Sequence, residues 1–378
     1  MASVPTSPAS SPAGTSATTP GLSEQDRAAA LQALTDAARF YRGQVERSWV
    51  PDYLNRRNLY SQLGPAGLGH APGGWATTRN HLRRHGHTDA VLVAAGLVRR
   101  TQQGRLVDVF RDRLMVPLTT SQGVLVGFTG RAIPDAADDV PKYLNSPASD
   151  IFAKHDLLYG LAEGAEALRR GAMPVLVEGP LDRLALTVAA RGLAVVGLAP
   201  CGTAFGPRQA RALLNTIGAR RPVAVALDPD PAGRDATRRA WEVLTGAGAQ
   251  HLRHVALPDG RDPAELVRNG RAKVLRHAIA TSTPLAHAVA DTTITAAAIS
   301  PEDWPRALTL ARQLFQTDLP RVPTDQVASY VAHVAGRLHL DLETATAAAA
   351  DAVSTTTSDP RPTLTTQGAA PSRGAGRA

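Results

Sequence analysis

Two spacings of hydrophobic residues alternate along the chain, and each change of spacing marks a region of different architecture. Apolar residues within 31–41 lie three and four positions apart, as on one face of a helix, and Ser23 with Asp26 forms a capping-box pattern ahead of them. Apolar runs at 114–118 and 124–128 are separated by turn-forming residues, which predicts a β-hairpin. The N-terminal part of the chain therefore has the pattern of an α+β region.

A regular alternation of short apolar runs and helical segments follows, from about residue 174 to 271. The expected strands are 175–177, 193–198, 223–227 and 251–257, and the expected helices are 181–190, 207–217 and 233–244. Strands joined by helices of about ten residues form parallel sheets with right-handed crossovers. We therefore predict an α/β domain with a central parallel sheet flanked by helices. From 272 to 353 the pattern is helical throughout, and prolines mark the breaks.

Five segments follow from these patterns. They are a tail over 1–22, a basic α+β subdomain over 23–170, an α/β domain over 171–271, a helical subdomain over 272–353 and a second tail over 354–378. The tails are rich in small and polar residues and are predicted to be disordered. No run approaches the roughly 18 apolar residues of a membrane helix, and the start lacks the parts of a secretory signal. We expect a cytoplasmic protein with no membrane partner.

Charge adds a preference for anionic partners. The 378 residues carry a formal net charge of +8, which favours nucleic acid or nucleotides. Arginine supplies nearly all of the basic residues, a bias that GC-rich genomes also produce, so clustering is the better indicator. Eight arginines lie within 79–113, where they form either a template track or a solvated face. His81 and His85 are spaced either to hold a metal or, as Arg83 and Arg84 between them favour, to face solvent or DNA.

The single cysteine, Cys201, limits the chemistry further. It excludes an internal disulfide framework and any zinc site built on several cysteines. We expect Cys201 to be a buried small residue or a loop thiol rather than a nucleophile. A reducing compartment fits this cysteine usage best.

Acidic residues follow the predicted strands at the positions where open parallel sheets bind ligands. Glu178 ends the first strand, Asp228 and Asp230 end the third, and Asp262 follows the fourth. Carboxylates that converge there repel one another unless cations neutralise them, and oxygen ligands suit Mg²⁺ or Mn²⁺. Two such ions could clamp the attacking and leaving oxygens of a phosphoryl transfer.

Helix capping is the alternative use of these carboxylates. It is the more common use of Asp182 or Asp259, each taken singly. It explains Glu178 together with Asp228 and Asp230 less well, because glutamate caps helices poorly and Asp-x-Asp before Ala-Gly is unusual at the end of a strand.

These residues carry a resemblance to a known family. The segments Val-Glu-Gly-Pro-Leu-Asp at 177–182 and Asp-Pro-Asp-Pro-Ala-Gly at 228–233 resemble the two signature motifs of the Toprim domain. The segments 110–118, 141–160 and 257–263 are similar to blocks around that domain in bacterial DnaG-type primases. The resemblance extends over about residues 30 to 340 and consists of several motifs in the same order.

The resemblance implies a core that synthesises short RNA primers on single-stranded DNA from nucleoside triphosphates, by two-metal-ion nucleotidyl transfer. It implies that Glu178, Asp228 and Asp230 are catalytic and that they bind Mg²⁺ or Mn²⁺ together with Asp262. The implied nucleotide- and template-binding residues are Arg113, Arg131, Lys142, Tyr143, Asn145, Lys154 and Asp182. Arginine and lysine match phosphates, and a tyrosine can stack on a base. An ordinary exposed position is the alternative for the two arginines.

Departures from the family pattern leave other functions open. The zinc ribbon that usually reads the template has no counterpart here, so we expect no structural zinc and consider a zinc-ribbon protein in trans or a replicative helicase as partners. Ala264 stands where a second acid is common, and Thr129 where a glycine is common. The alternatives are a Toprim-type metal-dependent nuclease and a non-catalytic nucleic-acid-binding subunit of a mobile-element replication complex. The block around Lys142 argues against a nuclease, which needs no triphosphate site.

Overall fold

The computed structural model describes residues 21–357 except 201 and 203, and the chain divides into two compact units. The first unit contains the chain up to Leu54 and residues Gln62–Leu157. The second contains Asn55–Ser61 and the chain from Leu158 onward. The segment 158–170, expected with the N-terminal subdomain, therefore lies in the second unit.

Helix α1 (Glu24–Gly43) contributes buried residues to the hydrophobic core of the first unit. The Ser23 hydroxyl accepts a hydrogen bond from the backbone N–H of Asp26 at 3.1 Å, which confirms the predicted start of the helix. Leu34 and Tyr41 are buried as expected, with Ala33 and Ala37 between them, and the Tyr41 ring packs edge-to-face on Phe128 at 5.4 Å.

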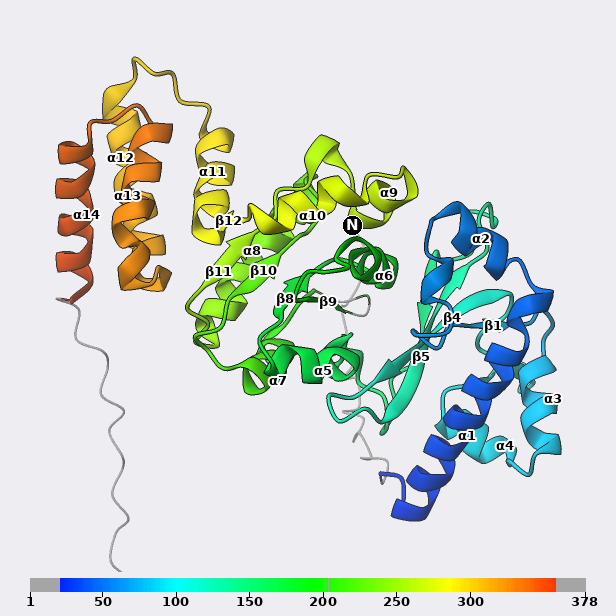
Figure 1. Ribbon diagram of the computed structural model, residues 1–378. Coiled ribbons are helices and arrows are strands. Elements are labelled where there is room, and N and C mark those ends of the chain that lie inside the picture. The colour runs from blue at the N-terminus through cyan, green and yellow to red at the C-terminus, as the bar shows by residue number, and fades with distance from the viewer. Residues whose placement is uncertain (1–20, 201, 203, 358–378) are drawn as a thin grey trace, which may run out of the picture. The chain divides into compact units, whose positions relative to one another are not determined.

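The other elements of the first unit are short helices and the strands of two small antiparallel sheets (Figure 1). They are α2 (Val50–Arg56), β1 (Gly69–Ala71), α3 (Thr77–Arg84), α4 (Asp89–Ala94), β2 (Val98–Arg100), β3 (Leu106–Asp108), β4 (Arg113–Thr119), β5 (Leu125–Ala132) and β6 (Tyr143–Asn145). The strand order is β1-β4-β5-β6, and β2 pairs separately with β3. Strands β4 and β5 form the predicted hairpin, and its turn uses Gly123 at φ +83°, a left-handed conformation that glycine adopts without strain.

The second unit is built on a six-stranded sheet with the order β12-β11-β10-β8-β9-β7. Its elements are β7 (Leu158–Tyr159), α5 (Leu161–Arg169), β8 (Met173–Leu176), α6 (Pro180–Ala189), β9 (Val195–Pro200), α7 (Pro207–Ile217), β10 (Val223–Val225), α8 (Pro231–Gly246), β11 (Leu252–His254), α9 (Pro263–Arg268), α10 (Ala272–Ala280), β12 (Thr283–Pro284), α11 (Leu285–Ala297), α12 (Trp304–Asp318), α13 (Val327–Arg337) and α14 (Leu342–Thr357). The four central strands are parallel, which confirms the α/β prediction, and the two edge strands are antiparallel.

The order of the central strands creates a switch point at β8. The chain crosses from β8 through α6 to β9, and then returns past β8 through α7 to β10 and through α8 to β11. Because both directions use right-handed crossovers, α6 covers one face of the sheet and α7 and α8 cover the other (Figure 1). Ligands of such sheets bind at the carboxyl ends of the strands where the direction reverses, here β8 and β10.

The C-terminal region departs from the all-helical prediction at one place. Residues Thr283–Pro284 form β12, which pairs antiparallel with β11, while α11–α14 form the predicted helices. The Arg253 side chain holds this strand by donating to the Ser282 hydroxyl at 2.8 Å. Proline fits an edge strand because the hydrogen bond that it cannot donate is not required there. The two-residue strand lacks the alternating pattern from which longer strands are predicted.

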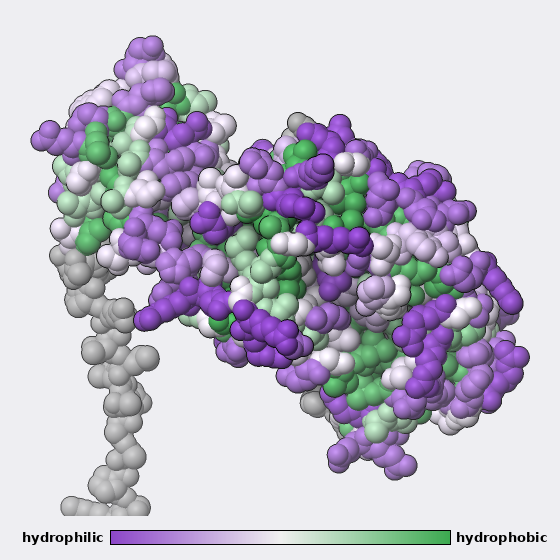
Figure 2. Space-filling view, in the orientation of Figure 1, coloured by the Kyte–Doolittle hydropathy of each residue, from purple (hydrophilic) through white to green (hydrophobic). Residues whose placement is uncertain are grey.

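Both predicted tails lie mostly outside the described residues. Within the described part, helix α14 continues to Thr357, so the start of the expected C-terminal tail is helical. No helix among residues 21–357 is long and apolar enough to cross a membrane. Hydrophilic residues are interspersed with apolar ones over the face of the molecule in Figure 2.

Gly69 tests the packing of α1 on the first sheet. A β-carbon at this position would lie 2.6 Å from Cβ of Tyr41 and 2.9 Å from its backbone carbon. Since overpacking costs about 1–3 kcal/mol, we expect Gly69→Ala to lower the free energy of unfolding of the first unit by this amount in urea titrations. Gly73→Ala is the control, because its added carbon meets nothing within 4 Å. Equal stability of both variants would contradict this packing.

Candidate active site

Two loops meet at the switch point of the second sheet. Glu178 follows β8, and Asp228 follows β10. The Glu178 side chain accepts a hydrogen bond from the backbone N–H of Asp228 through Oε1, at 3.0 Å. The sheet topology thus brings together two acids that lie fifty residues apart, as the sequence predicted.

Asp182 connects a third loop to this pair. It lies in the first turn of α6, where its Oδ2 accepts from the backbone N–H of Gly179 at 3.1 Å and its Oδ1 from that of Ala264 at 3.3 Å. The first bond is the helix-capping role considered for this residue. The second ties the loop after β8 to the first turn of α9, next to Asp262. Asp182 therefore fixes the positions of neighbouring acids, and its contact with nucleotide or template stays a prediction.

Asp230 and Asp262 are also helix caps. Oδ1 of Asp230 accepts from the backbone N–H of Gly233 at 2.7 Å at the start of α8, and Asp262 accepts from Glu265 at the start of α9. A carboxylate that caps a helix through one oxygen keeps its other oxygen for a ligand. Capping and metal binding, weighed above as alternatives, are therefore compatible at these two positions.

Gly233 explains the spacing of the Asp-x-Asp-x-x-Gly segment. A β-carbon on Gly233 would lie 1.9 Å from the carbonyl oxygen of Asp228. Only glycine permits this close approach, which lets α8 begin immediately beside the Asp228 loop. The guanidinium of Arg234 reinforces the loop by donating to the carbonyl of Pro229 at 2.7 Å.

The acids at this edge of the sheet repel one another. Burial, followed by the charges of Glu178, Asp262 and Asp230, raises the pKa of Asp228 to about 7. Burial and the charges of Asp262, Asp228 and Glu178 raise the pKa of Asp182 to about 7 as well. Each shift shows that the ionised form lacks a compensating positive charge.

A divalent cation fits this donor set. Oδ1 of Asp228 is buried and has no hydrogen-bond partner among the described residues, and the charged groups that act on Asp228 are the carboxylates of Glu178, Asp262 and Asp230. Among the described residues, which leave out Cys201 and the side chain of Asp259, no three histidine, cysteine, aspartate or glutamate side chains form a group that could hold a metal ion by themselves. Mg²⁺ rarely needs three protein ligands, because it keeps several waters and binds through one or two carboxylates plus substrate phosphates.

The basic residues predicted to bind nucleotide or template lie in the first unit and differ in accessibility. Arg113 is 5% exposed and donates to the carbonyls of Gly130 at 3.0 Å and Pro141 at 2.9 Å, so its guanidinium holds the sheet together. This burial contradicts the ordinary exposed position considered for it. Lys142 and Lys154 are exposed, and their ammonium groups are accessible to an anion.

Arg131, Tyr143 and Asn145 form a group on neighbouring strands. Arg131 pairs with Tyr143 in the β5–β6 register, donates to the Tyr143 hydroxyl at 3.2 Å and is 8% exposed. Asn145 lies two residues farther along β6, on the same side as Tyr143. The guanidinium of Arg131 also lies over the ring of Tyr53, at 5.2 Å. Arg131 is thus buried between two aromatic rings, and it is not the exposed arginine considered as the alternative.

Many groups in the arginine-rich stretch are engaged within the protein. Arg79 makes two 2.7 Å hydrogen bonds to Asp89, an ion pair that Arg83 joins at 3.0 Å. Arg111 lies 4.2 Å above the ring of Trp75, whose side chain is exposed. The sequence analysis missed this exposed pair, because only the fold places Trp75 beside Arg111.

Two other sequence predictions have mixed outcomes. His81 on α3 and His85, the C-cap residue of that helix, lie together as predicted, with their ring centroids 4.3 Å apart, but His81 stacks on Phe40 at 4.0 Å. These rings belong to no group of three metal-ligating side chains in the described part of the chain. Cys201 and the side chain of Asp259 lie outside the described residues.

Comparisons with known proteins agree with this geometry. Residues 40–165 match the family model of the DNA primase catalytic core, N-terminal domain, and residues 175–267 match that of Toprim-like domains. The DNA primase of Pseudomonas putida is 36% identical over 247 residues, 63% of this chain and 36% of the relative. That of Mycolicibacterium smegmatis is 33% identical over 280 residues, 72% and 43% of the two chains. The chain thus spans about two fifths of the length of these relatives.

Solved structures extend the similarity to most of the chain. The RNA polymerase domain of the Mycobacterium tuberculosis primase DnaG, in complex with a double-stranded DNA oligomer that has a 6-nucleotide overhang, superposes with a TM-score of 0.70. It is 28% identical and covers 82% of this chain and 98% of its own. A DnaG primase catalytic domain bound to single-stranded DNA gives a TM-score of 0.67 at 28% identity, over 85% and 99% of the two chains.

The repulsion between the acids makes a testable prediction. In EDTA, Asp228→Asn removes one of the repelling charges, and we expect its melting temperature to exceed that of the wild type. Mn²⁺ is expected to raise the melting temperature of the wild type and to raise that of the variant much less, because a ligand that binds only the folded state stabilises it.

Asp235→Asn is the control for this prediction, since Asp235 is exposed on α8 and is not among the charges that raise the pKa of Asp228. A variant Asp228→Asn that melts below the wild type in EDTA, and gains as much from Mn²⁺, would show that these acids do not repel one another around a cation site.

Proposed function

Because the chain carries the catalytic core of the DnaG-type DNA primases, we propose that it synthesises short RNA primers on single-stranded DNA from nucleoside triphosphates. The observation that supports this most directly is the meeting of Glu178, Asp182 and Asp228 at the switch point of the sheet, where the charges of neighbouring acids help to raise the pKa of Asp182 and Asp228. The DnaG primase catalytic domain of known structure that is bound to single-stranded DNA supports a single-stranded template.

The acids are proposed to hold Mg²⁺ or Mn²⁺ through Glu178, Asp228, Asp230 and Asp262. When bound, such cations neutralise the charge that develops on the phosphoryl oxygens. Asp182 holds the loop after β8 beside the start of α9 by accepting hydrogen bonds from the backbone N–H groups of Gly179 and Ala264.

In the reaction, the 3′-oxygen of one nucleotide forms a bond to the α-phosphorus of a second, and the bond from that phosphorus to pyrophosphate breaks. Pyrophosphate leaves, and the proton of the 3′-hydroxyl passes to a carboxylate. Glu178 is the proposed acceptor because its side chain is exposed.

Binding of the triphosphate and template is assigned to the first unit. Lys142 and Lys154 are exposed point charges for phosphate oxygens, and half-buried Tyr143 is proposed to stack on a base. Arg113 and Arg131 are proposed to act indirectly, because their hydrogen bonds fix the strands that carry these residues. A zinc-ribbon protein, a replicative helicase and a cytoplasmic setting stay sequence predictions.

Substitution of the acids tests the reaction. We expect Glu178→Gln and Asp228→Asn to lower primer synthesis at least about 100-fold on single-stranded DNA with nucleoside triphosphates and Mg²⁺ or Mn²⁺, since each removes charge from the proposed cation site. Glu242→Gln, an exposed position on α8, is expected to match the wild type. The assay is run with and without an added zinc-ribbon protein and reads radiolabelled products.

The outcomes separate the candidate functions. Primers that form equally well with Glu178→Gln would remove the proposed site. Metal-dependent cleavage of DNA without nucleotide incorporation would favour the nuclease. Binding of single strands that persists in EDTA, without turnover under any metal, would favour the non-catalytic subunit.

Two lysines, Lys142 and Lys273, provide a matched test of nucleotide binding. Lys142→Ala is expected to raise the KM for nucleoside triphosphate about tenfold with an unchanged melting temperature, since it removes one charged contact of roughly 1.5 kcal/mol. Lys273→Ala removes an exposed lysine on α10 and is the control. If the two variants have the same KM, Lys142 does not bind the triphosphate.

A further inference from the structure

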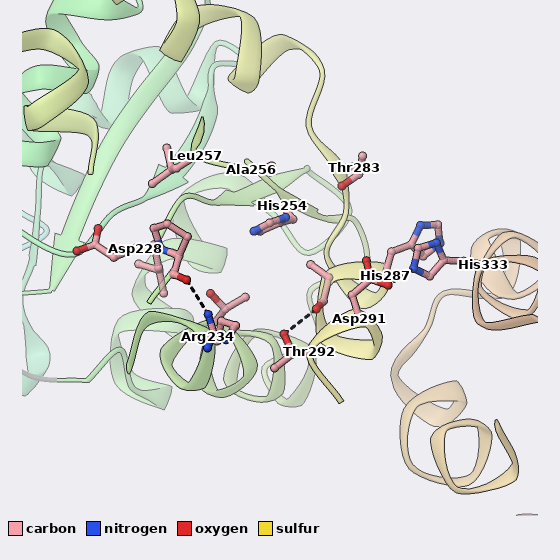
Figure 3. A pocket seen from close by; sticks show the side chains of 14 residues that line it. Asp228, Arg234, His254, Ala256, Leu257, Thr283, His287, Asp291, Thr292 and His333 are labelled. Carbon is pink, nitrogen blue, oxygen red and sulfur yellow. Dashed lines mark hydrogen bonds and ion pairs between the residues drawn. The ribbon is translucent and has the colours of Figure 1, made fainter. Parts of the chain in front are cut away.

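The second unit contains a cavity of about 470 Å³ beside the candidate active site. It is bounded by the loop after β10, by α8, by the end of β11, and by helices α11 and α13 (Figure 3). Asp228 lies at one end, His287 and His333 lie at the other, and His254 lies between them (Figure 3). We refer to it as the histidine cavity. One end of it is therefore formed by a proposed cation ligand.

Two histidines of the cavity, His254 and His287, are suited to hydrogen bonding as neutral rings. Burial lowers the pKa of His254, and burial together with the charge of His333 lowers the pKa of His287 to about 4. A neutral imidazole offers one donor and one acceptor. The ring of His254 makes no hydrogen bond to any residue in the described ranges, so both of its nitrogens are available to a ligand.

Flat and hydroxyl-bearing surfaces line the rest of the histidine cavity. The rings of His287 and His333 are stacked with centroids 4.2 Å apart and planes 6° apart. The Thr237 hydroxyl donates to the carbonyl of Gly233, which leaves its oxygen able to accept a hydrogen bond. Leu227 and Leu257 provide apolar walls. Such a mixture of apolar walls and a few polar groups is typical of small-molecule sites, whose volumes are about 300–1,000 Å³.

The charges in the histidine cavity argue against a triphosphate as its ligand. Arg234 is the one lysine or arginine among the described residues that line it, and its guanidinium is already bonded to Pro229. Asp291 carries a negative charge that His333 and Arg337 hold at 2.9 and 2.8 Å. A triphosphate needs several cations, whereas a base and a sugar need hydrogen-bonding groups and apolar walls.

We propose that the histidine cavity holds the base and sugar of the first nucleotide of a primer, with its 3′-hydroxyl directed to the Asp228 end. This assignment rests on the proposed function. When no primer exists, the enzyme must bind two free nucleotides, and the one that attacks contributes a hydroxyl rather than a triphosphate to the reaction. The cavity provides a place for that nucleoside, and Asp228 lines the end to which its hydroxyl is proposed to be directed.

Dinucleotide synthesis tests this assignment. The KM of each nucleotide is measured on a template that requires two different bases, so that first and second nucleotides are varied separately. We expect His254→Leu to raise the KM of the first nucleotide about tenfold, and at least five times more than the KM of the second, because one hydrogen-bonding ring is lost. His254→Gln, which keeps a donor and an acceptor, should restore most of the affinity. His277→Leu, exposed on α10, is the control.

A binding measurement that needs no catalysis accompanies the kinetics. Adenosine and guanosine, which lack phosphates, are added to full-length protein with isotope-labelled histidines. We expect them to shift the ring signals of His254 and His287 and not that of His277.

The results distinguish the two proposals. Primer synthesis by His254→Leu with an unchanged KM for the first nucleotide, together with unshifted His254 and His287 signals, would overturn the cavity assignment and leave the proposed function standing. Absence of primer synthesis by the wild-type chain under every condition would overturn the function, and the cavity assignment with it.

Discussion

Electrostatic repulsion at one edge of a parallel sheet is the constraint on which the rest of the second unit depends. Crossovers in opposite directions from β8 leave the loops after β8 and β10 side by side, and both loops carry acids. Burial alone would favour the protonated acids, and the mutual charges add to that effect. A fold that keeps such an arrangement does so at a cost in stability that a cation bound there would offset.

Helix capping also reduces the cost in stability of placing several acids close together. Asp182, Asp230 and Asp262 each accept a backbone N–H at the start of a helix, where the partial positive charge of the helix dipole favours a carboxylate. Two of the proposed cation ligands, Asp230 and Asp262, are therefore positioned by main-chain atoms rather than by flexible side chains. Gly233 belongs to the same arrangement, because the absence of its side chain permits the contact between α8 and the Asp228 loop.

Local patterns predicted the elements well, and distant contacts only in part. The parallel strands, the β4–β5 hairpin and the helices after β8, β9 and β10 follow from spacing, and the meeting of Glu178 with Asp228 follows from topology. The burial of Arg113 and Arg131 could not be predicted, because an arginine in a sequence looks the same whether its partners are carbonyl groups or water. His254 and His287 lie on separate elements, so only the folded chain reveals that they share a cavity.

The short strand β12 has a mechanical consequence. Its main-chain hydrogen bonds attach it to β11, and α11 begins at the next residue. No flexible linker therefore separates the bundle of α11–α14 from the sheet. A tilt of the bundle must therefore be transmitted to the edge of the sheet as torque instead of being absorbed by a linker. Insertion of glycines after Pro284 would supply a flexible linker, so that the bundle could rotate independently of the sheet.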